Sequence, residues 1–186
     1  MLFHIGNAQV EPEELLTDES EYLDLAVFDV SEYTPENLGI GGEIPTNFKE
    51  VDLETPPDVP AEGSYVMFGG YPKGRRRAEG RNVEWASFNT GGARVDQSTG
   101  RNVVCRLLTD KDVMERAGFP SGPIPELGGI SGGPVLQERA TESGIIIPEI
   151  IGFIYEHGNE EAELDLLMIR PITYLNPDGT LNDPNR

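Results

Sequence analysis

The sequence predicts an all-β protein, and three observations support this fold class. The chain is rich in turn-forming residues, with 22 Gly and 15 Pro among 186 residues. Helical periodicity over many residues is scarce, and the apolar residues form short runs bounded by turn residues instead. A chain of this length suffices for one domain, or for two small barrels that share a core.

The charge of the chain argues against two classes of partner. A formal net charge of −19 disfavours binding to nucleic acid or to an anionic membrane and favours cationic partners. No apolar run reaches the length of a membrane span, and the N-terminus lacks a basic region followed by an apolar core. If this N-terminus is the original one, the sequence predicts a cytoplasmic protein.

Cysteine and histidine are too few for a structural metal site. The sequence has one cysteine, Cys105, and two histidines, so it offers neither an intrachain disulfide nor the ligands of a structural zinc ion. We therefore predict no metal and no cofactor.

The N-terminal part is expected to contribute one core strand. Residues 1–5 favour the end of a strand, and residues 6–20 are polar and acidic, which is typical of a surface loop. In residues 22–30 the alternating positions are largely apolar on both faces, which predicts a buried strand. Asp24 stands at its head, where a buried carboxylate needs a partner. It either has such a partner or caps a loop at the start of the strand.

The rest of the chain alternates apolar runs with turn material. Residues 31–61 are rich in Pro, Gly and Glu, and favour a connection between two β units. Residues 73–81 are rich in Lys and Arg, and form either a docking patch or a solvated hairpin tip. Strands are expected over 63–72, 83–89, 102–108, 134–136, 145–155 and 164–169, turns over 91–92 and 97–100, one short helix over 109–118, a proline-rich loop over 119–126, and a frayed tail over 176–186.

The most informative stretch is the glycine-rich run that surrounds Ser131. A serine flanked by glycines lies on backbone with few side chains around it, so its hydroxyl can be approached closely. Neighbouring amides in such a run can point at a developing oxyanion. The same run is equally typical of a plain turn before a buried strand.

The pattern Gly129-Ile130-Ser131-Gly132-Gly133-Pro134 resembles the nucleophile loop of trypsin-like (chymotrypsin-fold) serine peptidases of the bacterial, HtrA-like type. The Asp-Leu-Ala-Val segment that begins at Asp24 resembles the segment that carries the aspartate of their triad. The resemblance implies Ser131 as nucleophile, Asp24 as the residue that orients a histidine, and the amides of Gly129 and Ser131 as the oxyanion hole.

The resemblance also implies a peptide or protein substrate. Residues 152–158 resemble the strand on which family members bind the substrate backbone by β-augmentation. By that alignment Tyr155, Glu156 and His157 border the specificity pocket, and Pro125 lies at its base.

The catalytic base is the weak point of this interpretation. In the family a histidine precedes the aspartate, but His157 follows Ser131, and His4 lacks the small-residue context and the preceding strands. The chain is therefore interpreted as a fragment of a serine endopeptidase, with little activity as it stands, or as a catalytically dead relative. A peptide-binding or scaffold module on the same fold, and an unrelated β-barrel with a coincidental serine turn, remain the alternatives.

The same resemblance divides the chain. It implies a chymotrypsin-like double β-barrel whose first barrel is incomplete and whose second barrel is largely present. Residues 1–45 are expected to be the remnant of the first barrel, 46–61 a linker, 62–175 the second barrel, and 176–186 the tail.

Overall fold

The protein is described from a computed structural model, which covers residues 3–5, 8–33, 51–72, 76–79, 82–85, 88–108, 128–157 and 166–186. The chain forms two compact units, and each is described by itself. The first comprises Met1–Thr55 and Tyr174–Arg186, and the second comprises Pro56–Thr173. The helix expected over 109–118 and the loop over 119–126 lie outside the described residues.

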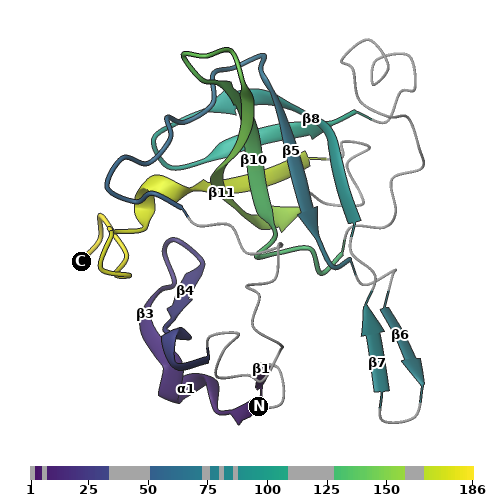
Figure 1. Cartoon of the computed structure of the whole chain (residues 1–186), viewed down its shortest axis with the longest axis vertical. Helices are drawn as coiled ribbons and strands as arrows, with labels where there is room; N and C mark the ends of the chain where they lie inside the picture. Colours follow the sequence, from purple (N-terminus) through teal and green to yellow (C-terminus); the bar gives the residue numbers. More distant parts are fainter. Residues whose placement is uncertain are drawn as a thin grey trace. The chain divides into compact units, whose positions relative to one another are not determined.

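The second unit is a closed antiparallel barrel (Figure 1). Around the barrel the strands follow the order β5-β8-β9-β12-β11-β10, and β10 pairs with β5 to close it. Two consecutive three-stranded meanders are thus joined edge to edge. The six strands are β5 (Tyr65–Gly70), β8 (Phe88–Ser98), β9 (Val103–Leu107), β10 (Pro134–Ala140), β11 (Ile146–His157) and β12 (Leu166–Pro171). The all-β prediction is confirmed, because the described residues contain almost no helix.

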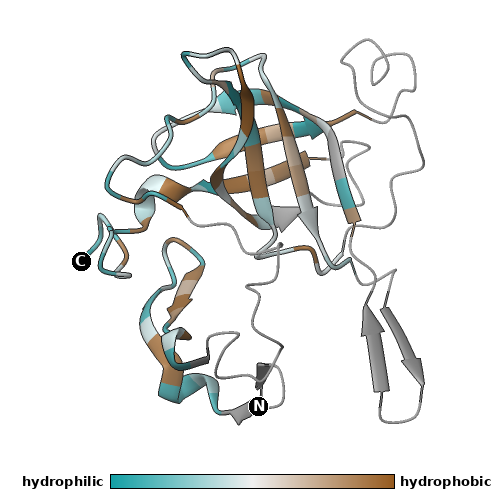
Figure 2. Ribbon diagram, in the orientation of Figure 1, coloured by the Kyte–Doolittle hydropathy of each residue, from teal (hydrophilic) through white to brown (hydrophobic). Residues whose placement is uncertain are grey.

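Apolar residues recur along the barrel strands (Figure 2), and those that point inward form one buried core. In β9 every second residue is buried, beginning with Val103, and in β5 Val66 and Phe68 are buried in the same way. The rings of Phe68 and Phe88 lie 6.0 Å apart in a tilted arrangement. The barrel core also includes Ala93, Val95, Cys105, Leu107, Ile130, Val135, Ile151, Ile154, Leu167 and Ile169.

Between β5 and β8 the chain forms a separate two-stranded ribbon, β6 (Arg76–Glu79) and β7 (Asn82–Trp85). Its register sets Arg76 opposite Trp85 and Arg77 opposite Glu84. Part of the basic run therefore falls on β6. The rest of that run lies outside the described residues, so both of its interpretations stay open.

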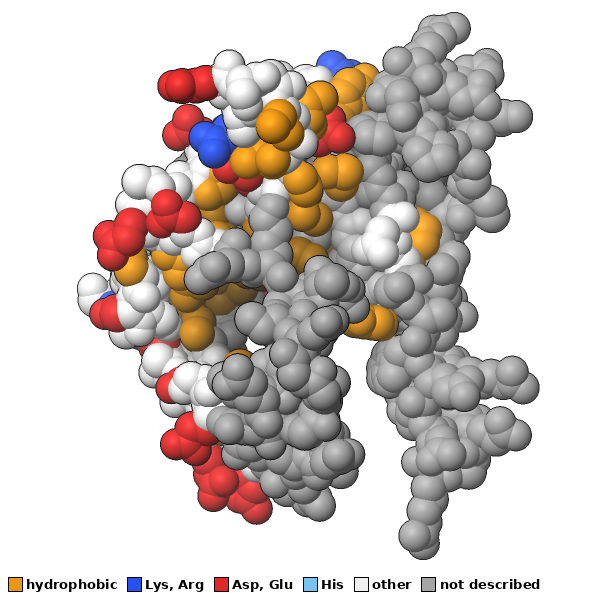
Figure 3. All heavy atoms as spheres, viewed as in Figure 1, with side chains coloured by type: hydrophobic (Ala, Val, Ile, Leu, Met, Phe, Trp, Pro, Cys, Tyr) orange, Lys and Arg blue, Asp and Glu red, His pale blue; other side chains and the backbone are white. Residues whose placement is uncertain are grey.

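The first unit contains two small antiparallel pairs: β1 (Phe3–Ile5) with β2 (Ala8–Val10), and β3 (Leu16–Ser20) with β4 (Leu25–Phe28). The helix α1 (Pro12–Leu15) and the short 3₁₀ helix η1 (Ser31–Tyr33) complete its described N-terminal part. The surface loop expected over 6–20 is therefore wrong, since most of these residues belong to β2, α1 and β3. Carboxylates gather over α1 and β3 in the space-filling view (Figure 3).

The buried strand expected over 22–30 is also wrong. Only Leu25–Phe28 forms a strand, and Ala26 and Phe28 are exposed. The physical reason is that β4 belongs to a sheet of two strands, so the described residues give it no second neighbour. Apolar alternation alone did not distinguish a strand in a large sheet from one in a hairpin.

The C-terminal segment is held by specific bonds, contrary to the expected frayed tail. The carboxylate of Asp18 on β3 accepts a hydrogen bond of 2.7 Å from the amide of Leu181 and pairs with Arg186. The hydroxyl of Ser20 donates to Asp183. These bonds tie a segment of polar composition to the N-terminal hairpin, which composition could not predict.

Candidate nucleophile loop at the start of β10

Ser131 lies in a tight turn directly before β10. The amide of Gly133 donates to the carbonyl of Ile130 at 2.9 Å, which closes a four-residue turn with Ser131 at its second position. Gly132, at the third position, has a φ of 83°, the value that a type II turn requires and that glycine adopts without strain. The sequence thus specifies a turn that presents Ser131 at a corner.

Two neighbouring strands hold this turn in place. On the β5 side, a methyl group added at Gly133 would collide with the carbonyl oxygen of Gly69. It would also lie 2.9 Å from the carbonyl oxygen of Ile130 within the turn itself. A methyl group at Gly70 would lie 2.6 Å from the side chain of Ile130, which is itself buried. Glycine is needed at both positions because backbone and side chain approach so closely there.

On the other side the turn bonds to β11. The amide of Gly132 donates to the carbonyl of Ile154 at 2.7 Å, and the amide of Ile154 donates to the carbonyl of Gly133 at 2.9 Å. The turn that carries Ser131 is therefore held between β5 and β11, by close backbone approach on the β5 side and by hydrogen bonds to Ile154 on the β11 side.

The amides of the loop divide into two groups. Those of Gly132 and Gly133 are used within the fold. Among the residues that the structure describes, those of Gly129 and Ser131 donate no backbone hydrogen bond, and the Ser131 hydroxyl has no partner. Gly129 and Ser131 are both exposed. The two amides predicted to bind an oxyanion are thus available, and the serine oxygen can be reached.

Beyond Ile154, β11 continues along β12 with Glu156 opposite Met168 and His157 opposite Leu167. The ladder with β10 ends at Phe153, so over the described ranges β10 does not cover this last part of β11. The register with β12 shifts between Ile154 and Glu156, which makes Tyr155 a β-bulge. Bulges of this kind redirect side chains beside functional sites.

Tyr155 is held by a cluster that sequence reasoning missed. Its hydroxyl donates to the sulfur of Met168 at 3.4 Å, and the guanidinium of Arg170 lies 4.2 Å from its ring centroid. Arg170 is buried, and it donates to the carbonyl of Arg101 at 3.2 Å and to the side-chain oxygen of Asn102 at 2.5 Å. The signal available in the sequence was an arginine at the end of an apolar strand.

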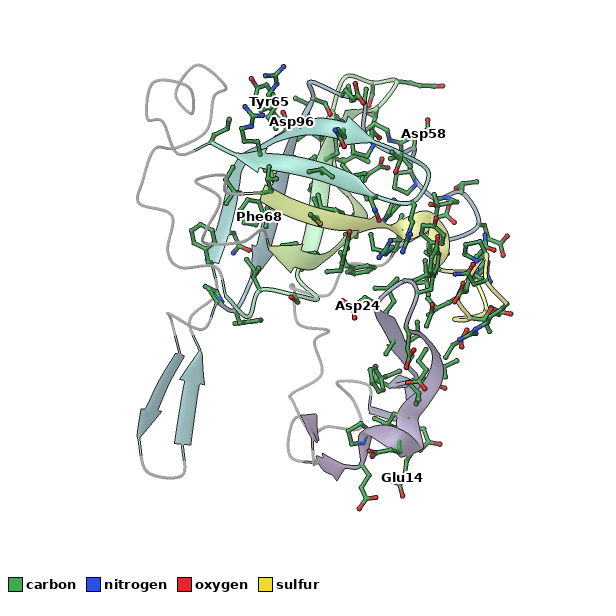
Figure 4. The ribbon with its side chains drawn as sticks, turned by 180° about the vertical axis from the view of Figure 1, so that it is seen from behind. Glu14, Asp24, Asp58, Tyr65, Phe68 and Asp96 are labelled. Carbon is green, nitrogen blue, oxygen red and sulfur yellow. The ribbon has the colours of Figure 1, made fainter. Side chains whose placement is uncertain are left out.

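Asp24 belongs to the first unit, whereas Ser131 belongs to the second. Asp24 is exposed in the turn between β3 and β4, with a φ of 53° and its amide 3.3 Å from the carbonyl of Glu21 (Figure 4). Asp is among the few residues that adopt this conformation readily. The alternative that Asp24 serves the local turn therefore has a direct geometric basis, and its catalytic role stays a prediction.

The remaining candidate residues are described only in part. His4 lies on β1, and Glu156 and His157 lie on β11, each by its backbone. Pro125 lies outside the described residues. Of the candidate residues, Ser131 and Tyr155 are each next in sequence to a residue of one bonded pair, because Gly132 bonds to Ile154.

The described part of the chain offers neither a metal-binding cluster nor a reactive thiol. It contains no group of three or more His, Cys, Asp or Glu residues placed to hold a metal ion. Burial, followed by the charge of Asp96, raises the pKa of the Cys105 thiol to about 12, so this buried cysteine is no nucleophile. None of the described helices is both long and apolar enough to span a membrane.

No family model matches this sequence, and no curated protein or solved structure matches the chain. Its function has to be argued from the loop, its neighbours and the residue pattern.

Proposed function

We propose that the second unit is the nucleophile-bearing barrel of a trypsin-like serine endopeptidase, which hydrolyses peptide bonds through an acyl-enzyme. The observation that carries the proposal is that some polar groups of the loop bond within the fold and others do not. Gly132 and Gly133 use their amides to fix the turn, while the hydroxyl of Ser131 and the amides of Gly129 and Ser131 face no described partner.

The proposed reaction follows from these groups. The Ser131 oxygen bonds to the scissile carbonyl carbon while its proton passes to a base, and the amides of Gly129 and Ser131 stabilise the oxyanion. When the carbon–nitrogen bond breaks, the base returns the proton to the departing amine. Water then hydrolyses the serine ester. Part of the substrate backbone pairs with the end of β11 that β10 leaves uncovered.

The proposal assigns Asp24 to orient the base, on the strength of the sequence resemblance alone. No histidine side chain lies among the described ones, so the base is unidentified. A serine without its base loses most of its reactivity. The rival, a peptide-binding module on the same barrel, uses the same β11 edge and needs no reactive serine.

Chemical rescue separates these two functions. Imidazole added to the chain supplies a proton acceptor, and a fluorophosphonate probe reports serine reactivity as a covalent mass increase on a mapped peptide. We expect labelling of Ser131 to be slow alone and to rise with imidazole concentration. Ser143, which is exposed in the β10–β11 turn, is the matched control and should not respond.

Labelling that is equal at Ser131 and Ser143 would contradict the peptidase proposal. Fast labelling of Ser131 without imidazole would instead show that the chain already supplies a base. In both cases the Ser131→Ala variant confirms which serine carries the probe.

A further inference from the structure

The strand order around the barrel places Tyr71 on the β5 side of the Ser131 turn and Tyr155 on the β11 side. β10 lies between β11 and β5 in the barrel. Pro134 pairs with Phe153 on one side, and Val135 pairs with Phe68 on the other. Beyond these pairs the chain enters the turn, where Gly132 and Gly133 both bond to Ile154 of β11, and Gly133 closely approaches Gly69 of β5. The residues of β11 and β5 that contact the turn, Ile154 and Gly70, are each followed by a tyrosine.

Close contacts support this placement. The side chain of Ile130 lies against the backbone of Gly70, where an added methyl group would be 2.6 Å away. Tyr71 follows Gly70, and Ser131 follows Ile130, so each is one residue, about 3.8 Å of chain, from that contact. Tyr71 therefore follows directly on the stretch of backbone that the residue before Ser131 contacts.

Tyr71 is one of the exposed large side chains in the described part of the chain. It is 57% exposed, and it makes no hydrogen bond or ring contact there. The next residue, Pro72, is buried and fixes the backbone just after Tyr71. An exposed aromatic residue on a fixed backbone beside a reactive group is suited to bind a ligand at low entropic cost.

We propose that Tyr71 is a specificity-determining residue that contacts the part of the substrate following the scissile bond. This inference rests on the proposed function. In the proposed function the acyl part of the substrate lies along β11, on one side of Ser131. The departing part therefore leaves on the other side, toward β5. The substrate residue that contacts Tyr71 carries a large apolar side chain, because an aromatic face favours apolar contact and the basic run that begins at Lys73 disfavours a cation.

A cleavage profile tests the inference. The protein, with imidazole present, is incubated with a library of synthetic peptides, and mass spectrometry records the residues on both sides of each cut. We expect large apolar residues to be enriched in the first two positions after the cut. The Tyr71→Ala variant should lose this enrichment, with kcat/KM about fivefold lower for peptides that carry Leu there.

The control is Tyr65→Ala, which removes another exposed tyrosine from the opposite end of β5. It should leave the profile unchanged, and Tyr71→Ala should leave the preference before the cut unchanged. Cleavage with an unaltered profile in Tyr71→Ala would overturn the inference alone. If the unsubstituted protein cuts no peptide, the inference falls together with the proposed function.

Discussion

Substituting three glycines of the Ser131 loop by alanine should give three different losses of stability. At Gly128 an added methyl group meets nothing within 4 Å, and the backbone is not left-handed, so the change should be neutral within about 0.5 kcal/mol. At Gly132 the space is also open, but the φ of 83° strains alanine, which costs about 1–2 kcal/mol.

At Gly133 the methyl group collides with two carbonyl oxygens, those of Gly69 and Ile130. Neither oxygen can swing away, because both belong to backbone held by the barrel. Forcing extra atoms into such a site costs about 1–3 kcal/mol, and we expect the upper end of that range here. The order of stability is therefore Gly128→Ala, then Gly132→Ala, then Gly133→Ala.

Urea unfolding followed by circular dichroism measures this order. With an m-value of about 2 kcal/mol/M, a loss of 3 kcal/mol lowers the midpoint by about 1.5 M, while Gly128→Ala leaves it in place. Equal midpoints for Gly132→Ala and Gly133→Ala would refute the argument that close approach of β5 fixes the turn. A large loss at Gly128 would refute the stated geometry of the loop.

Three further outcomes follow from the structure. The hydrogen bond from the amide of Leu181 lowers the pKa of Asp18, and the hydrogen bond from the Ser20 hydroxyl lowers the pKa of Asp183. The bonds that these carboxylates make to and within the C-terminal segment should therefore be complete above the ordinary pKa of 3.8 and lost as pH falls below it. Hydrogen exchange of residues 174–186, measured between pH 5 and 2 and corrected for intrinsic rates, should lose protection while the barrel keeps its own. Replacing Arg170 by Lys removes the Nη1 group that donates to both Arg101 and Asn102, and also the guanidinium plane over the Tyr155 ring, so we expect a loss of about 1–3 kcal/mol in urea unfolding. An unchanged midpoint would contradict this. The buried Cys105 thiol should resist Ellman's reagent at pH 8 in the native protein and react within minutes in 8 M urea, whereas fast reaction without urea would show that the core is open.

The strands of the barrel were largely predictable, because their apolar alternation reflects burial against one shared core. The runs over 63–72, 102–108 and 164–169 contain β5, β9 and most of β12. Gly91-Gly92, however, was expected to be a turn, and it lies inside the long strand β8. Glycine pairs are typical of turns, but a closed barrel also needs strands that bend, and the β5–β8 register does shift in this region.

The glycines of the candidate site were predictable, because the backbone geometry there requires glycine. Gly132 and Gly133 are required by the turn and by the approach of β5, so their pattern reports a shape. The contacts of Arg170 could not be predicted, because they depend on which strands become neighbours when the barrel closes. The first unit was predicted least well, since its hairpin is completed by a segment more than a hundred residues away in sequence.

Within the loop, residues that the fold requires differ from Ser131, which the fold does not require. The fold itself accounts for the glycines around Ser131, and a plain turn would need them equally. The second position of a type II turn, in contrast, accepts most residues, and the fold needs no hydroxyl there because the described residues give it no partner. Ser131→Ala should therefore leave the free energy of unfolding in urea unchanged within about 0.5 kcal/mol while it abolishes the imidazole-dependent labelling. A clear loss of stability would mean that the serine serves the turn, and the main reason for assigning it a reaction would be lost.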